Sequence, residues 1–195
     1  MEISAYQMPP NNDIYVQQNM LTEISKNKDY DSFHIFTNQS FSYKQVLGQS
    51  LFPSTTEIGV ELNHYFQTSI FCSYTFQNFF IDNNKSKMQV NDFWYCGNSL
   101  AVVPYASSLV HPKIKIYGGA GQAYGTDTTN PQTPKSIVIY YWSLKPVISA
   151  ELNISENIKF SLGAGYQFVF SKDSRDFAKL ISDLEGIASI SYNFK

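Results

Sequence analysis

Residues 145–170, KPVISAELNISENIKFSLGAGYQFVF, read as two long strands joined by a short polar turn. Apolar or aromatic side chains fill the even positions of both strands, while the odd positions are mostly polar residues or glycine, with Val147 and Val169 as exceptions. Successive side chains of a strand point to opposite faces, so this hairpin has one apolar and one polar face. The alternation runs for about ten residues per strand, which is the length that crosses a bilayer at a tilt.

Composition limits the class of protein. The chain has 195 residues, a length that suits one domain. It contains no run of 18 apolar residues, which excludes a transmembrane helix. A mean hydropathy of −0.24 is compatible with a barrel whose strands alternate lipid-facing and lumen-facing residues. A net charge of −2 argues against a nucleic-acid partner.

The same alternation recurs along most of the chain. It predicts one strand before residue 55 and seven more, near 56–65, 69–80, 88–104, 113–124, 137–153, 157–170 and 185–194. Short connections at 65–68, 105–112 and 154–157 alternate with longer ones at 81–87, 125–136 and 171–184. An even strand number with short turns on one side is typical of outer-membrane barrels. We therefore predict an all-β fold, a closed antiparallel up-and-down transmembrane β-barrel of eight strands with short periplasmic turns and longer extracellular loops.

The first part of the chain is less regular. We treat residues 1–195 as a single barrel domain in which residues 8–54, rich in Asn, Gln and Ser, form a long surface loop or an N-terminal extension. Residues 2–7 alternate weakly and are a candidate short strand. The alternative makes residues 33–44 the first spanning strand and residues 1–31 a flexible arm.

The centre of a hairpin turn fixes which residues of its two strands lie opposite one another, and this predicts contacts in the hairpin that contains residues 145–170. A turn about Ser155 sets Glu151 opposite Lys159 inside the barrel, an attractive cross-strand pair. Outside, the same turn sets Trp142 opposite Phe168 and Tyr140 opposite Phe170.

A turn about Asn84 gives a second register. It sets Tyr74 opposite Trp94 on the outer face and Cys72 opposite Cys96. A disulfide and two reduced, lipid-facing cysteines both remain open, because directly opposed cross-strand residues often have poor disulfide geometry.

Two groups of residues follow from these faces. An aromatic girdle at the membrane interfaces is predicted from Tyr74, Trp94, Tyr140, Trp142, Phe168, Phe170, Tyr192 and Phe194. Inward-facing charges of both signs are predicted at Glu57, Glu61, Lys145, Glu151 and Lys159. In a narrow barrel such charges must be paired, which favours a structural network over a polar path or proton relay.

The sequence contains no strong motif for a catalytic, phosphate-binding or metal-binding site. The run YGGAGQAYG (117–125) is not followed by a helical pattern, which a phosphate loop requires. The three histidines, His34, His64 and His111, lie near predicted turns, and no His-x-Ser motif accompanies them. We assign no catalytic residue, no metal site and no cofactor. Apolar residues at 177, 180, 181 and 184 have helical spacing, which predicts a short amphipathic helix that caps the barrel mouth.

The last strand, GIASISYNF (186–194), resembles the C-terminal assembly signal of bacterial outer-membrane barrels, although Lys195 follows its terminal aromatic residue. With the Gly-Ala-Gly-Tyr and Tyr-Gly-Gly-Ala-Gly strands, residues 55–194 resemble the small opacity and adhesin-type barrel family of Gram-negative bacteria. That resemblance implies three kinds of partner: outer-membrane lipid or lipopolysaccharide, the barrel-assembly machinery through the C-terminal strand, and a host or envelope protein through the loops.

The resemblance also implies a non-enzymatic surface role in cell-envelope structure, adhesion or partner binding, because function in this group lies in variable loops. A small pore, a lipid-modifying enzyme and a soluble lipocalin-like carrier are the alternatives. The chain starts without a basic or apolar leader, and its strand pattern favours an outer-membrane protein whose signal peptide has been removed.

Overall fold

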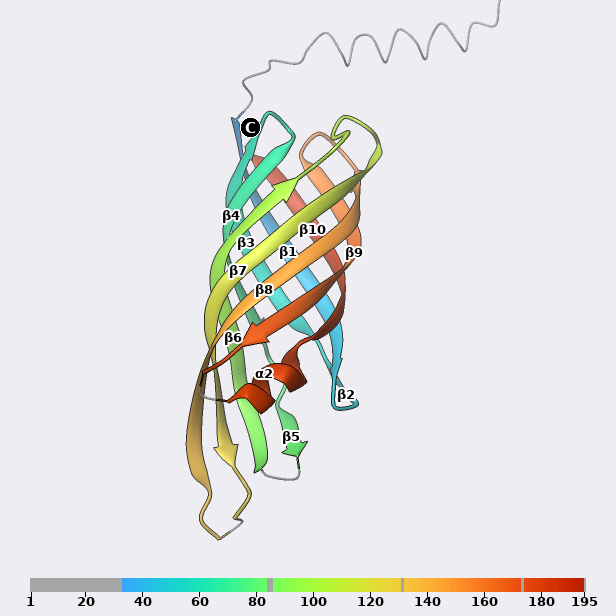
Figure 1. Ribbon diagram of the computed structural model, residues 1–195. Helices are drawn as coiled ribbons and strands as arrows, with labels where there is room; N and C mark the ends of the chain where they lie inside the picture. The colour runs from blue at the N-terminus through green and yellow to red at the C-terminus, as the bar shows by residue number, and fades with distance from the viewer. Residues whose placement is uncertain (1–32, 84–85, 131, 173, 195) are drawn as a thin grey trace, which may run out of the picture. The chain divides into compact units, whose positions relative to one another are not determined.

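The computed structural model describes residues 33–83, 86–130, 132–172 and 174–194. Within them the strands form one closed antiparallel barrel (Figure 1). Its eight strands are β1 (Phe33–Val46), β3 (Pro53–Leu62), β4 (Phe66–Thr75), β6 (Ser86–Val102), β7 (Val110–Asp127), β8 (Lys135–Asn153), β9 (Ile158–Phe170) and β10 (Asp183–Phe194). Each strand pairs with the next, and β1 pairs with β10 to close the ring.

Short elements lie at one end of the barrel. Strand β2 (Gln49–Leu51) pairs with β1, and β5 (Phe79–Asn83) pairs with the first part of β6. Helix α2 (Arg175–Ile181) lies between β9 and β10. We call this the loop end, and the opposite end, with connections at 63–65, 103–109 and 154–157, the turn end. No helix in the described ranges is long and apolar enough to span a membrane.

The start of the barrel corrects one expectation. Strand β1 begins at Phe33, so the predicted loop over 8–54 is wrong for residues 33–46, and also for 49–51 in β2 and 53–54 at the start of β3. Residues 33–44 belong to the first barrel strand, as in the alternative. Outward-facing Thr37 and Gln39 interrupt the apolar face of β1, which hides its alternation in the sequence. The candidate strand at 2–7 and the rest of the N-terminal segment lie outside the described residues.

The register of the opening hairpin also differs from the prediction. Lys159 lies opposite Asn153, and Trp142 lies opposite Phe170, so the predicted register, which set Glu151 opposite Lys159, Trp142 opposite Phe168 and Tyr140 opposite Phe170, is wrong by two residues. The predicted attraction between Glu151 and Lys159 is still present, because the two side chains meet diagonally at 3.8 Å. The turn is centred one residue later than predicted, at Glu156 instead of Ser155, and the backbone N–H groups of Ile154 and Ser155 both donate to the carbonyl of Ile158. A shift of two keeps every side chain on its predicted face.

The second predicted register is confirmed. Tyr74 lies opposite Trp94, and Cys72 lies opposite Cys96. The two cysteines form a disulfide, with their Cα atoms 4.1 Å apart, which decides between the two alternatives.

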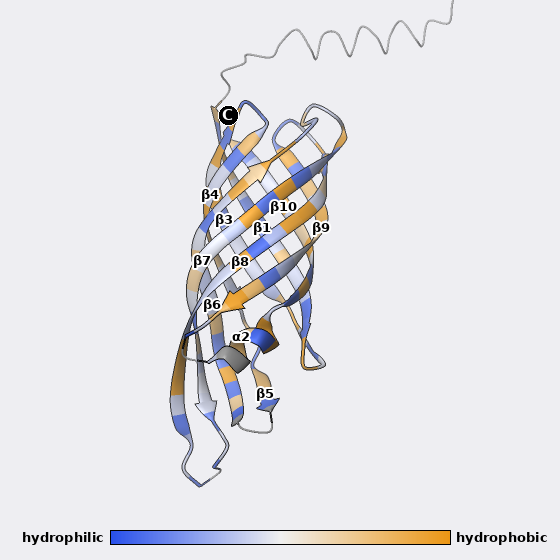
Figure 2. Ribbon diagram, in the orientation of Figure 1, coloured by the Kyte–Doolittle hydropathy of each residue, from blue (hydrophilic) through white to orange (hydrophobic). Residues whose placement is uncertain are grey.

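The two faces of the barrel wall differ in polarity. Large apolar side chains such as Ile148, Leu100 and Trp142 point outward and are more than 60% exposed, whereas the inward face is rich in buried serine, lysine and glutamate. Figure 2 shows the resulting alternation of hydrophilic and hydrophobic residues along the strands. A lipocalin-like carrier has the opposite arrangement, with its apolar face inward, so the structure excludes that alternative.

The disulfide between Cys72 and Cys96 should contribute to stability, since it closes a loop with a sequence separation of 24 residues. We predict that replacing both cysteines with serine lowers the free energy of unfolding by about 2–4 kcal/mol, mainly by relaxing the unfolded chain. Urea titration of the refolded barrel, with and without reductant, measures the change. The urea midpoint of the double-serine variant should not change when reductant is added. Equal urea midpoints for the unaltered chain and the variant, with and without reductant, would contradict the prediction.

Candidate functional site

The barrel interior holds a buried ionic network. Among the described residues its carboxylates are Glu57, Glu61, Glu151 and Glu185. Its buried lysines are Lys44, Lys113, Lys115, Lys145 and Lys159. Every one of these lysines lies within 3.4 Å of a carboxylate oxygen. All five predicted interior charges therefore take part in ion pairs, which fall into three groups, and the structure adds four charged residues that the sequence did not single out.

Glu57 is the centre of this network. Its carboxylate accepts hydrogen bonds from the Lys115 ammonium at 2.7 Å, the Tyr117 hydroxyl at 2.5 Å and the Asn38 amide at 2.8 Å. Ser69 donates a fourth bond at 3.0 Å. These donors come from β1, β4 and β7, so one carboxylate on β3 connects opposite walls of the barrel.

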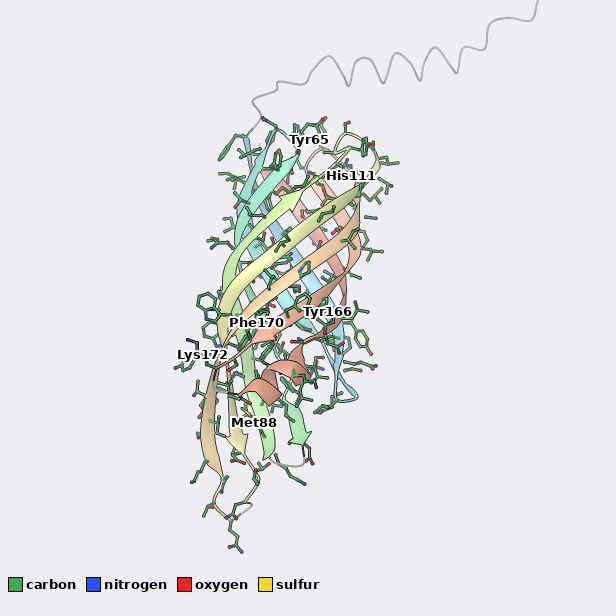
Figure 3. All side chains as sticks on the ribbon, viewed as in Figure 1. Tyr65, Met88, His111, Tyr166, Phe170 and Lys172 are labelled. Atoms are coloured by element: carbon green, nitrogen blue, oxygen red, sulfur yellow. A yellow bond between two sulfur atoms is a disulfide. The ribbon has the colours of Figure 1, made fainter. Side chains whose placement is uncertain are left out.

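A second group lies toward the turn end. Lys159 donates to Glu61 at 2.8 Å and lies 3.8 Å from Glu151, which also accepts from Lys113 at 2.8 Å. His111 contacts Glu151 through Nε2 at 3.2 Å and the Ser108 carbonyl through Nδ1 at 3.1 Å. His111, labelled near the turn end in Figure 3, is 2% exposed and is thus a buried member of the network rather than a surface histidine.

A third group lies toward the loop end. Glu185 pairs with both Lys44, at 3.4 Å, and Lys145, at 3.1 Å. Lys44 also donates to the Gln167 amide oxygen at 2.6 Å. The sequence missed Lys44 because it lies in the stretch treated as a loop, and Glu185 because it stands at a predicted loop boundary. Lys113 and Lys115 could have been predicted to face inward, since they alternate with the apolar residues Ile114 and Ile116.

Apolar side chains close the barrel beyond Glu185. Phe177 and Ile181 of α2 point into the barrel and are 3% and 0% exposed. The Phe177 ring lies 6.4 Å from that of Phe93 and 6.3 Å from that of Tyr141. The Ser174 hydroxyl caps the helix by accepting from the Phe177 N–H. The predicted capping helix is confirmed over Arg175–Ile181, but Leu184, the last residue of the predicted helical spacing, lies in β10 and is 63% exposed. Together with the ion pairs the helix fills the interior.

The predicted girdle residues divide between the two ends. At the loop end Tyr140, Trp142, Phe168 and Phe170 are outward and at least 41% exposed, and Tyr74 and Trp94 are half-buried. Tyr192 and Phe194, 41% and 47% exposed, lie at the turn end, where β10 finishes. Their role as a girdle remains a proposal.

Outward-facing polar groups at the loop end have local partners. The Tyr74 hydroxyl donates to Asp92 at 2.5 Å, which accounts for an acidic residue on the apolar face. Three further aromatic residues near this end are exposed but were not among the predicted girdle residues: Tyr43, Phe52 and Phe76. The first two were missed because their segment was read as a loop.

The glycine run lies within β7, where it forms wall rather than a loop. A Cβ on Gly119 would lie 2.4 Å from the carbonyl oxygen of Cys96, so glycine allows β6 and β7 to approach closely. On the outer surface the run contributes to a groove of about 600 Å³ that Trp142 and Phe170 border. No helix follows β7, and the geometry is that of a strand rather than a phosphate loop.

Solved structures with a similar fold are small barrels. Neisserial surface protein A aligns with a TM-score of 0.52 at 10% identity, covering 83% of this chain and 97% of that one. The chain has the fold of a small outer-membrane β-barrel. No protein-family model matches this barrel, and no curated protein sequence matches it.

Two further structures resemble this outer-membrane-type barrel less closely. One is the attachment invasion locus protein Ail of Yersinia pestis in complex with the heparin analogue sucrose octasulfate, with a TM-score of 0.48 at 12% identity, covering 83% of this chain and 97% of that one. The other is the N-terminal β-barrel domain of Pseudomonas aeruginosa OprF, with a TM-score of 0.46 at 10% identity, covering 82% and 97%.

The network makes a direct prediction for Glu57. Replacing Glu57 with Gln leaves the Lys115 ammonium buried without its counter-charge, which typically costs about 3–5 kcal/mol. A matched control is Asp82→Asn, because Asp82 pairs with Lys87 at 3.3 Å where both side chains are 62% exposed. We predict a loss below about 1 kcal/mol for that control. Urea unfolding of both variants measures the difference, and equal losses would contradict the network.

The filled interior predicts that the barrel does not conduct ions. An eight-stranded barrel has an interior just wide enough for side chains, and here ion pairs and α2 occupy it. Planar bilayers containing the refolded barrel should therefore show no steady conductance. A stable open channel at neutral pH would instead support the pore alternative.

Proposed function

We propose that the chain is an integral, non-enzymatic outer-membrane protein that binds a protein partner at its loop end. The apolar outward face supports the membrane location, because lipid is the solvent that such a face requires. The disulfide between Cys72 and Cys96 supports passage through an oxidising compartment such as the periplasm. In this orientation the turn end faces the periplasm and the loop end faces outward.

One feature of the loop end supports partner binding. Strands β6, β7 and β8 continue beyond the end of β9, and Figure 1 shows the β7–β8 hairpin projecting past α2. Strand β8 pairs with β7 from Lys135 onward, but its first residue paired with β9 is Trp142. Residues 135–141 of β8 are therefore the edge strand of a projecting sheet.

The direction of the backbone shows which groups are on that edge. The Ser171 hydroxyl donates to the Tyr140 carbonyl at 2.8 Å, on the side away from β7. The backbone N–H and C=O groups of every second residue in a strand point to the same side. Those of Val138 and Ser136 therefore also point away from β7. In the described part of the chain no strand pairs with these two residues on that side. An edge of this kind is a template for adding an extended peptide as another strand.

The open β8 edge is the observation that carries the proposed function. Its partner would be an extended segment of a host or envelope protein, held by backbone hydrogen bonds beside the outward side chains of Val138 and Tyr140, which are 40% and 63% exposed. Lipid or lipopolysaccharide around the wall and the assembly machinery at β10 are further proposed partners. The buried glutamates are bound by lysines, an arrangement that supports a structural rather than a catalytic use of the interior.

The β8 edge is tested with Val138→Pro, which removes an N–H on the open side and leaves the β7 ladder intact. We predict that binding to a displayed library of extended 12-residue peptides falls about tenfold or more, since proline cannot donate to the added strand. Adhesion of a non-adherent Gram-negative strain that expresses the chain to cultured epithelial cells should fall in parallel.

The matched control is Val138→Thr, which changes the side chain but keeps the N–H, and it should bind as the unaltered chain does. Heat-dependent migration on gels verifies that each variant is a folded barrel. Equal binding by the proline and threonine variants would exclude the β8 edge as the binding element.

A further inference from the structure

A polar patch interrupts the outward apolar face of β1 and β3. It consists of Thr37 and Gln39 on β1 and Ser54 and Thr56 on β3, all half-buried or exposed, and we call it the Gln39 patch. Three of its members bond to one another, and the Thr37 hydroxyl donates to the Glu57 carbonyl at 3.1 Å. The Gln39 amide nitrogen donates to the Ser54 hydroxyl at 2.8 Å, and the Thr56 hydroxyl donates to the Gln39 amide oxygen at 2.7 Å.

The Gln39 patch lies within the apolar face, not at its edge. Along β1 it is bracketed by Ile35 and Phe41, which are 46% and 60% exposed. Along β3 it is bracketed by Ile58, 53% exposed, and by Phe52 just before the strand, 52% exposed. If the wall faces lipid, as proposed above, these four polar side chains lie at hydrocarbon depth.

Gln39 has hydrogen-bonding capacity left over. A carboxamide has two N–H donors and an oxygen with two lone pairs. The bonds of Gln39 among the described residues use one donor and one lone pair. Lipid tails offer no partner for the remaining groups, so a protein surface that supplies them is favoured.

A second copy of the chain meets these requirements. A carboxamide is both donor and acceptor, so two Gln39 side chains related by a two-fold axis can form two reciprocal hydrogen bonds. The patch carries no formal charge, so two copies brought together do not repel one another. The flanking Ile35, Phe41 and Ile58 side chains supply apolar contact around the amide pair.

We propose that the chain forms a homodimer in the plane of the membrane through β1 and β3, with Gln39 at the two-fold axis. The interface is isologous, with the axis normal to the bilayer, so both copies keep the same orientation across the membrane. The surface used is separate from the β8 edge, and dimerisation therefore goes beyond the proposed binding of a partner.

The dimer is tested by energy transfer between donor- and acceptor-labelled chains in phospholipid vesicles, followed as lipid is added. Gln39→Leu should weaken association about tenfold or more, because polar contacts between membrane segments are worth about that factor. The matched control is Asn98→Leu on β6, which likewise replaces an outward-facing amide and should leave association unchanged.

A cross-linking pair that keeps Gln39 gives an independent measurement. Ile58→Cys, beside the patch, should form a disulfide-linked dimer on oxidation, whereas Ile148→Cys on β8, at 62% exposed, should not. A monomer at every lipid ratio, equal effects of the two leucine variants, or equal cross-linking at both cysteines would overturn the dimer. Heat-dependent gel migration checks insertion, and a chain that does not insert would overturn the membrane location and the dimer together.

Discussion

The pairing of buried lysines with glutamates is the constraint on which the rest of the structure depends. A charge inside a narrow, water-poor barrel is tolerated only when a counter-charge and hydrogen bonds replace its solvent. Glu57 on β3 reaches Lys115 on β7, and Lys159 on β9 reaches Glu61 on β3. These contacts cross the barrel, so they form only when the ring closes with the correct register, and they make interior chemistry and wall geometry interdependent.

Much of the fold was predictable because a lipid-facing wall imposes a strict period of two. Seven of the eight strands, their directions and the faces of Glu151 and Lys159 follow from that period, and the eighth follows from the even number that a closed barrel requires. The exact partners do not, since the position of the turn sets the register, and a turn centred at Glu156 instead of Ser155 shifts the pairing by two residues. Strand β1 was the hardest to predict because Thr37 and Gln39 face outward, where the period calls for apolar residues.

The sequence predicted that the interior holds paired charges, but it did not identify all of the residues that form the pairs. Inward positions identified Glu57 and Glu61, yet Lys44 and Glu185 are paired by strands that are distant in sequence, β1 and β10, which meet only when the barrel closes. The loop end shows the same limit. The helical spacing of Phe177 and Ile181 predicted a helix, but the aromatic residues that receive it, Phe93 and Tyr141, come from β6 and β8.

The strand order places the projecting hairpin and the Gln39 patch far apart. Around the ring three strands separate β1 from β7 in either direction, so the β7–β8 hairpin is across the barrel from the wall formed by β1 and β3. In two chains joined through that wall, each β8 edge would lie on the side of its barrel that faces away from the interface. Both edges would then be free to engage one multivalent surface, and avidity would let individually weak strand pairing give durable attachment.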